Sequence, residues 1–358
     1  MIEEAGGQSK VKCLVWDLDD TIWDGILLED QRVALKEGVR ETIAELDRRG
    51  ILQSIASRNS LKAAEARLME LDIWDYFLYP QIHFGNKSDS IKQIAASLNI
   101  GLDSMAFIDD QPYELEEVRY HIPEIATIAA DRVGTLLEQP RFMPRFITQD
   151  SGRRRQMYRE DMQRAELEHQ YAGPQHEFLS TLQLELEISR MSEEDLQRAE
   201  ELTLRTHQLN STGYTYDYEE LLAFMQADDY ELWIVSLKDK FGDYGKIGLC
   251  LVDRSVAGIG MIKLLLMSCR VMNRGVGSVL IGFLQNWAIR ESIALQAEFI
   301  NTDRNRMMYM TYKFAGFEEI EENGPTIVFE SRREQEVSYP AYMKVAVMAD
   351  NAAASAKI

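Results

Sequence analysis

The chain has 358 residues, of which 46% are apolar, and its formal net charge is -20 at pH 7. A chain of this length usually exceeds what one hydrophobic core can organise, so two domains are expected. The strongly acidic balance disfavours non-specific binding to nucleic acid or to anionic lipid.

The three cysteines, Cys13, Cys250 and Cys269, are widely spaced and form no CxxC pair. An odd, scattered set indicates no disulfide framework and favours a reducing cytoplasm. The first ten residues lack the basic and apolar parts of a signal peptide, and the apolar run at 256–267 is short and interrupted by Lys263. We therefore expect a cytoplasmic protein with no membrane span.

Short apolar runs at 11–20, 51–59 and 104–110 alternate with helix-like stretches at 39–50, 61–72 and 90–99. This βαβα order predicts an α/β domain with a Rossmann-like doubly wound parallel sheet, which we place at residues 10–145. Polar residues follow each predicted strand: Asp17, Asp19 and Thr21 after the first, Ser57 after the second, Asp109 and Asp110 after the third. In an open α/β sheet these strand ends converge on one crevice.

The Asp-x-Asp-x-Thr pattern suits phosphoryl chemistry, since one carboxylate can attack phosphorus while the next protonates the leaving oxygen. Ser57 could hydrogen-bond a phosphoryl oxygen, and Lys87 could neutralise developing charge. Asp109 and Asp110 could complete an all-oxygen Mg²⁺ shell. Each residue alone is more often a turn, a cap or a solvated charge, but their order and their positions at strand ends favour a site.

The order DLDDT, ASRN, NKSDS and FIDDQPYE resembles the haloacid dehalogenase superfamily of aspartyl-phosphate hydrolases over roughly residues 12–127. The resemblance implies these roles: Asp17 as nucleophile, Asp19 as general acid, Thr21, Ser57 and Lys87 as phosphate contacts, and a Mg²⁺ site built from Asp17, Asp19, Asp109 and Asp110. Which of the last two binds the metal stays open. The short spacing before Ser57 leaves little room for a large cap domain, so the crevice is open to a bulky substrate or closed by the other domain.

A highly charged helical stretch at 146–174, with arginines at 153–155, predicts a linker helix. The Arg run either solvates this helix or docks an acidic partner. Apolar alternation at 182–191, 230–237, 246–253, 260–269 and 295–300 then predicts strands, and 276–290 predicts an amphipathic helix. We expect a second, α+β domain at 175–347 and a frayed tail at 348–358.

In the second domain, Gly275 and Gly277 precede the amphipathic helix, a layout that can present backbone N–H groups to a pyrophosphate. The later run RNRMMYMTYKFAGF, with Asn305 and Tyr312, resembles a motif of the GNAT fold of acyltransferases. Met272 stands where that family usually has Gln or Arg, which argues against tight coenzyme A binding. A groove for a phosphopantetheine arm, the piece shared by coenzyme A and acyl carrier protein, is compatible with the sequence.

Cys269 ends a predicted strand and is flanked by Arg270, with Arg274 close by, and such positive charge favours a thiolate. Cys13 and Cys250 lie inside apolar runs, where a buried thiol is the simpler explanation. We predict Cys269 as an acyl acceptor with His207 as its base, or with Tyr312 as an alternative acid or base.

From VWDLDDTIWDGILLED through RTHQLNSTG to LMSCRVMNRGVG, the chain resembles the FkbH-like glyceryltransferase/phosphatase family of polyketide biosynthesis. The resemblance implies that 1,3-bisphosphoglycerate is the substrate, that an acyl carrier protein receives the glyceryl thioester, and that the branch feeding methoxymalonyl units is involved. One alternative is a small-molecule phosphatase whose degenerate acyltransferase domain is an interaction module. A non-enzymatic scaffold is a third hypothesis, against which the intact Asp17, Asp19, Ser57 and Lys87 argue.

Overall fold

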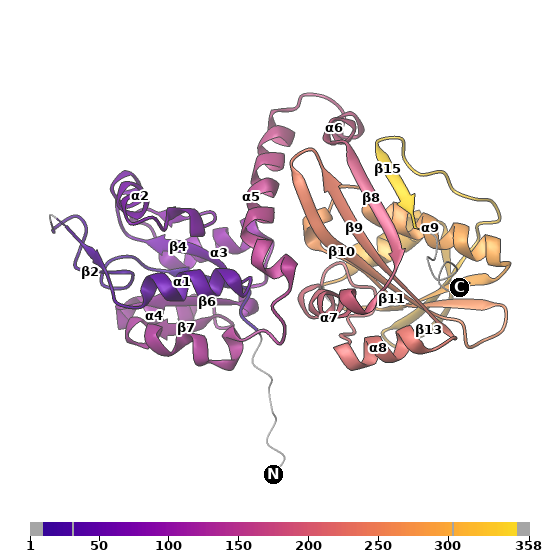
Figure 1. The fold of residues 1–358 in the computed structure, drawn as a ribbon, viewed down its shortest axis with the longest axis horizontal. Coiled ribbons are helices and arrows are strands. Elements are labelled where there is room, and N and C mark those ends of the chain that lie inside the picture. The colour runs from indigo at the N-terminus through magenta and orange to yellow at the C-terminus, as the bar shows by residue number, and fades with distance from the viewer. Residues whose placement is uncertain (1–9, 31, 303, 349–358) are drawn as a thin grey trace, which may run out of the picture. The chain divides into compact units, whose positions relative to one another are not determined.

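The computed structural model describes residues 10–30, 32–302 and 304–348 (Figure 1). The chain divides into two compact units, the first ending at Arg159 and the second beginning at Glu160. The predicted tail at 348–358 lies, apart from its first residue, outside the described residues. Within the described ranges, no helix is long and apolar enough to cross a membrane.

The first unit is built on a five-stranded sheet in which every neighbouring pair is parallel. Its order is β5-β4-β1-β6-β7, and the strands are β1 (Cys13–Trp16), β4 (Leu52–Ser57), β5 (Gln81–Ile82), β6 (Met105–Asp109) and β7 (Ala126–Ala129). All residues of β1, β4 and β6 are buried. A parallel sheet buried in this way must be covered on both faces.

Helices follow the strands in alternation: α1 (Val39–Arg48), α2 (Leu61–Glu70), α3 (Lys87–Leu98) and α4 (Pro112–His121), with short 3-10 turns η1 (Trp74–Tyr76), η2 (Leu102–Ser104), η3 (Ala130–Glu138) and η4 (Pro140–Phe142). Leu14 and Trp16 of β1 share one core cluster with α1 and α2, whereas α3 and α4 contact each other. The expected doubly wound parallel sheet is confirmed. Between β1 and α1 the chain adds only a small hairpin of β2 (Trp23–Asp24) and β3 (Ala34–Leu35).

Helix α5 (Gln149–Gln170) carries a buried stripe that is largely polar, with residues three or four positions apart: Ser151, Arg154, Met157, Glu160 and Arg164. In the first unit, Arg154 donates to the Gly50 carbonyl at 2.7 Å, and Arg155 pairs with Asp47 at 2.9 Å. These contacts favour the structural interpretation of the arginine run over partner docking. The predicted linker at 146–174 is divided between the two units.

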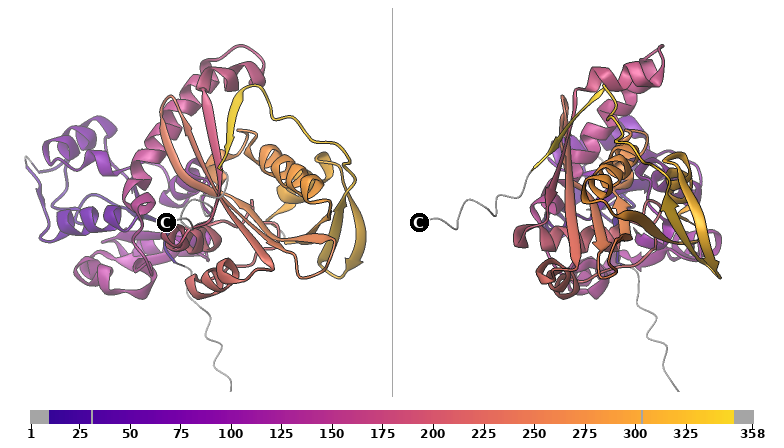
Figure 2. Two further views of the ribbon diagram at one scale, coloured as in Figure 1. Left: turned by 45° about the vertical axis from the view of Figure 1, so that its right-hand side comes forward. Right: turned by 90° about the vertical axis from the view of Figure 1, so that its right-hand side faces the viewer.

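The second unit contains an eight-stranded mixed sheet, seen from two sides in Figure 2. Its order is β13-β14-β12-β11-β10-β9-β8-β15. The strands are β8 (Leu184–Arg190), β9 (Tyr230–Asp239), β10 (Gly242–Asp253), β11 (Ile259–Met267), β12 (Ala294–Ile300), β13 (Phe317–Asn323), β14 (Thr326–Ser331) and β15 (Met343–Val347). The β11/β12 and β8/β15 pairs are parallel, and the other neighbours are antiparallel. The five strands expected from the sequence are β8 to β12.

Helices cover both faces of this sheet: α6 (Gln175–Leu182), α9 (Val276–Glu291) and α10 (Arg306–Phe314) on one, α7 (Leu196–Arg205) and α8 (Tyr218–Gln226) on the other, with 3-10 turns η5 (Glu193–Asp195) and η6 (Cys269–Val271). Side chains of β10 alternate between the two cores, because Cys250 packs with α9 and α10 while Leu249 and Leu251 pack with α7 and α8. The expected α+β architecture is confirmed.

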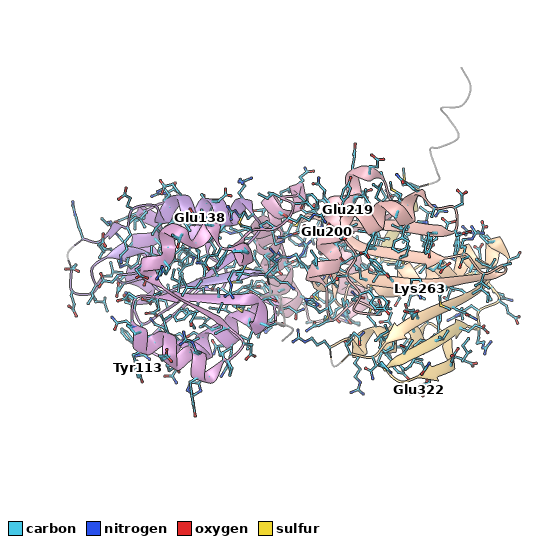
Figure 3. The ribbon with its side chains drawn as sticks, turned by 90° about the horizontal axis from the view of Figure 1, so that it is seen from below. Tyr113, Glu138, Glu200, Glu219, Lys263 and Glu322 are labelled. Atoms are coloured by element: carbon cyan, nitrogen blue, oxygen red, sulfur yellow. The ribbon has the colours of Figure 1, made fainter. Side chains whose placement is uncertain are left out.

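Strands β11 and β12 pair only at their first residues, Ile259–Ile262 against Ala294–Ala297. Where they part, Lys263, labelled in Figure 3, forms an ion pair with Glu298 of β12. Residues 209–211 occupy the space beyond, and we call this segment the strand insert. The Met267 amide donates to the insert at 2.9 Å, the insert donates to the Leu265 carbonyl at 3.0 Å, and the Ile300 amide donates to the insert at 3.1 Å.

The second half of α5 is fixed by Arg164, whose side chain is fully buried. Its guanidinium binds both oxygens of Asp239, at 2.7 and 2.9 Å, binds Asp161 at 2.8 Å, and lies 3.9 Å from the centre of the Tyr244 ring. A buried carboxylate that loses its cation is strongly destabilising. We expect Arg164→Met to reduce the free energy of unfolding of the second unit by about 3–5 kcal/mol in urea titrations.

The matched control is Arg159→Met, because Arg159 lies on the same helix and pairs at 2.9 Å with Asp75, a mostly exposed carboxylate. Exposed ion pairs contribute about 0–1 kcal/mol, so this variant should unfold almost like the wild type. Equal losses in the two variants would contradict the structural role given to the Arg164 pair.

Candidate functional site

The first candidate site lies at the carboxyl ends of β1 and β6. Asp17 directly follows β1, Asp109 is the last residue of β6, and both are buried. Lys87, the first residue of α3, places its Nζ atom 2.9 Å from Asp17 Oδ1 and 2.6 Å from Asp109 Oδ2. The sequence prediction that these strand ends converge is therefore confirmed for this trio.

The three buried charges change one another's protonation. Burial raises the pKa of Asp17, against the opposing effect of Lys87. Burial and the nearby Asp17 charge raise the pKa of Asp109 to about 6. Burial alone would lower the pKa of Lys87, but the two carboxylates outweigh it and raise that pKa. Lys87 therefore stays an ammonium at neutral pH, and it compensates part of the negative charge.

A cation could join this site, because Asp17, Asp109 and Asp110 each offer a carboxylate oxygen, and these oxygens lie within 4.8 Å of one another. The buried Thr21 Oγ1 has no hydrogen-bond partner among the described residues. An orphaned hydroxyl beside clustered carboxylates fits a bound ligand that is rich in oxygen. An all-oxygen donor set of this kind suits a hard cation such as Mg²⁺.

The Asp19 carboxylate is directed away from this metal-binding cluster. Its Oδ1 accepts hydrogen bonds from Trp23 Nε1 at 2.8 Å and the Leu27 amide at 3.0 Å, and its Oδ2 accepts from Asn59 Nδ2 at 3.0 Å. Burial raises the pKa of Asp19, while the N–H donors oppose the change. The sequence analysis counted Asp19 among the metal-binding carboxylates, but the structure engages its carboxylate with these three donors instead. About four lone-pair sites exist on a carboxylate, so one remains for a proton.

The Ser57 side chain, predicted to contact phosphate, is buried and hydrogen-bonds to Asp17. Sequence reasoning missed Trp23 and Asn59, although each stands two residues beyond a motif residue, Thr21 or Ser57. That spacing was the only signal available. It identified neither residue as a donor to Asp19, because the loops that carry them meet only in the fold.

Replacement of Lys87 tests the buried trio. Without its ammonium, the Asp17 and Asp109 carboxylates face each other uncompensated, so Lys87→Met should lower the metal-free unfolding free energy by about 3–5 kcal/mol at pH 8. The loss should shrink at pH 5, because protonation of the carboxylates removes their repulsion. Thermal unfolding at both pH values, with and without Mg²⁺, measures this. Lys92→Met, on the exposed side of the same helix, is the control and should have little effect.

The second candidate site surrounds Cys269, which begins η6 just beyond β11 and is half-buried. Its Sγ atom lies 4.0 Å from Gln208 Oε1. Gln208 and its neighbour His207 are exposed and immediately precede the strand insert. The fold thus brings the residue next to His207 against Cys269, while the direct pairing of His207 with the thiol stays a prediction.

The two arginines predicted to act on Cys269 have partners within the second unit. Arg270 donates to the Tyr244 carbonyl at 2.7 Å. Arg274 is buried and pairs with Glu168 of α5 at 2.8 Å. Both charges are thus partly compensated before they can act on the thiol.

Asn305 and Tyr312 are both fully buried. Asn305 Nδ2 donates to the Asn210 carbonyl of the strand insert at 3.0 Å and to the Ile300 carbonyl at 2.9 Å. Burial raises the pKa of Tyr312, which also senses the buried thiol of Cys250. A phenol of this kind is a poor base at neutral pH, so the structure favours His207 over Tyr312 for that role.

The two glycines at the start of α9 are packed against the chain itself. Gly275 has a positive φ of 78°, and a Cβ atom built on it would lie 2.1 Å from the Tyr342 hydroxyl. A Cβ atom on Gly277 would lie 3.1 Å from the terminal methyl of Met267. The predicted glycine loop therefore exists, but its near space is taken by side chains of this unit.

No protein-family model matches the chain, and no curated protein matches it. Among solved structures, the N-terminal, phosphatase-domain part of a Bacteroides fragilis protein, solved with Mg, is 33% identical over 34% of this chain and 36% of that chain, with a TM-score of 0.29. The alignment thus spans about a third of that protein's length. A ribosomal-protein alanine N-acetyltransferase from Escherichia coli is 14% identical over 43% of this chain and 99% of that chain, with a TM-score of 0.33. An N-acetyltransferase from Thermoplasma acidophilum in complex with coenzyme A is 16% identical over 41% of this chain and 99% of that chain, also with a TM-score of 0.33.

Proposed function

We propose that the protein is a bifunctional, Mg²⁺-dependent phosphatase and glyceryltransferase of the FkbH-like kind. It takes 1,3-bisphosphoglycerate, removes phosphate, and loads a glyceryl thioester onto an acyl carrier protein for a polyketide extender unit. The observation that carries the phosphatase half is Lys87 bridging buried Asp17 and Asp109, with the orphaned Thr21 hydroxyl beside them. The resemblance of the whole sequence supports the transferase half.

In the loading step, the Cys269 thiolate attacks the acyl carbon of the substrate. The new S–C bond replaces the C–O bond to phosphate, inorganic phosphate leaves, and the thiol proton passes to His207. An acyl phosphate is a good electrophile for a thiolate, so this step needs no further activation of the leaving group. The carrier thiol then displaces the acyl group by thioester exchange and regenerates Cys269.

In the phosphatase step, Asp17 attacks the phosphorus of the remaining monoester, the P–O bond to carbon breaks, and Asp19 protonates the leaving oxygen. Water then attacks the aspartyl-phosphate, Asp19 accepts its proton, and phosphate is released. Asp17, Asp109 and Asp110 would hold Mg²⁺, which supplies charge neutralisation at the phosphoryl oxygens. Lys87 and Thr21 hold the same oxygens from the protein side.

A second candidate is favoured by one observation: the strand insert and the partners of Arg270 and Arg274 fill positions that an active acyltransferase would leave open. On this hypothesis the protein is a small-molecule phosphatase, and its second unit is an interaction module.

Incubation with 1,3-bisphosphoglycerate and a panel of holo-carrier proteins, followed by intact-protein mass measurement, separates the two. A glyceryl mass on a carrier supports the bifunctional enzyme. Phosphate release with no acyl mass on any protein supports the simple phosphatase, and absence of both rejects the two proposals together.

A further inference from the structure

The second unit offers two places where the arm of a thiol cofactor could lie, and the chain fills both. One is the gap between β11 and β12, where three backbone hydrogen bonds join the strand insert to both strands. The other is the start of α9, where the Tyr342 hydroxyl takes the space beside Gly275. A glycine loop at a helix N-terminus binds phosphate only if phosphate oxygens can approach its backbone closely.

Tyr342 is well placed to prevent that approach. Its ring is half-buried and packed against the main core cluster of the unit, so it does not swing freely in solvent. The hydroxyl would be 2.1 Å from a Cβ atom on Gly275, which is closer than any non-bonded contact. A diphosphate at this loop would have to displace a packed phenol. Arg274, the adjacent cation, is already paired with Glu168.

We propose that Tyr342 is a selectivity residue that excludes the pyrophosphate and nucleotide of coenzyme A, so that the acyl acceptor is pantetheine carried on a protein. This inference rests on the proposed acyl transfer and names its acceptor. Coenzyme A and a carrier protein present the same thiol arm. They differ beyond its phosphate, where coenzyme A continues as a nucleotide pyrophosphate and a carrier continues as a phosphodiester to serine. A block at the glycine loop distinguishes the two without changing access to Cys269.

Calorimetric titration of the full-length protein with coenzyme A tests the block directly and needs no acyl chemistry. The wild type and Tyr342→Phe should show no binding below about 1 mM, whereas Tyr342→Ala should bind at least about tenfold more tightly than the wild type. ADP should displace coenzyme A from Tyr342→Ala, because the gained contact is to the pyrophosphate. Wild-type affinity equal to that of folded Tyr342→Ala would overturn the proposal, as would no gain in that variant.

A second measurement keeps the test decisive if Tyr342→Ala does not fold. Gly275→Ala should lower the melting temperature by roughly 4 °C more in the wild type than in a Tyr342→Phe background, because only the wild type has the hydroxyl in contact. The same loss in both backgrounds would show that the phenol does not occupy the loop. If these results hold but no adduct forms on Cys269, the acyl transfer is wrong and the exclusion of coenzyme A stands.

Discussion

Asp17→Asn should abolish release of the monoester phosphate, by about 10⁴-fold or more, while the protein still forms the acyl adduct. The amide cannot attack phosphorus, and it also removes one carboxylate from the cluster that would hold Mg²⁺. Cys269 belongs to the other unit, so loading does not depend on this residue. A phosphoglyceryl adduct should therefore accumulate, which intact-protein mass and phosphate release measured together would show.

The matched control is Asp24→Asn, in the hairpin that follows the same motif. Asp24 is exposed, and its nearest cation is Lys36 at 4.0 Å, so its loss should leave phosphate release unchanged. EDTA should reproduce the Asp17→Asn result in the wild type and spare loading. A dephosphorylated adduct made at the normal rate by Asp17→Asn would exclude the aspartyl-phosphate mechanism.

The parallel sheet of the first unit could be predicted because its signals are local. Each strand is a continuous apolar run, as a strand buried on both faces requires, and each ends in a polar motif residue such as Asp17 or Ser57. The convergence of these motifs follows from the parallel order alone. The hydrogen bonds of Asp19 could not be predicted, since Trp23 and Asn59 reach it from loops whose paths depend on packing.

The second unit was predicted less completely, for physical reasons that differ by element. Strand β13, which carries Glu322 in Figure 3, is an exposed edge strand with the sequence FEEIEEN, and it has only one buried side chain. Charged edge strands resist aggregation but lose the apolar alternation that reveals a strand. The strand insert carries no periodic signal at all, because it is held by backbone hydrogen bonds and by Asn305, 95 residues beyond Asn210.

The roles of Arg270 and Arg274 show the same limit. Beside Cys269 in the sequence, two arginines indicate a positive field at the thiol. In the fold, Arg274 meets Glu168, which lies 106 residues earlier, and Arg270 reaches the Tyr244 carbonyl. Sequence neighbours predict which charges are near a group, but they do not reveal what already neutralises those charges.

Cys269 should carry the acyl adduct after incubation with 1,3-bisphosphoglycerate, and Cys269→Ala should lose carrier loading by at least about 10³-fold. The structure makes the other two thiols internal controls. Cys13 and Cys250 are fully buried in strands, and burial raises the pKa of the Cys250 thiol, so neither is a reactive thiolate. Cys269 is half-exposed at the end of β11, beside Gln208.

Peptide mapping of the adduct distinguishes the three thiols, and His207→Ala tests the base. If His207 takes the thiol proton, its loss should slow loading most near neutral pH and least at high pH, where hydroxide deprotonates the thiol without help. Gln208→Ala is the neighbouring control, because it removes the nearest side chain to Sγ without removing a titratable group. The same pH profile in both variants would assign that segment a packing role, and an adduct on Cys250 would reject Cys269 as the nucleophile.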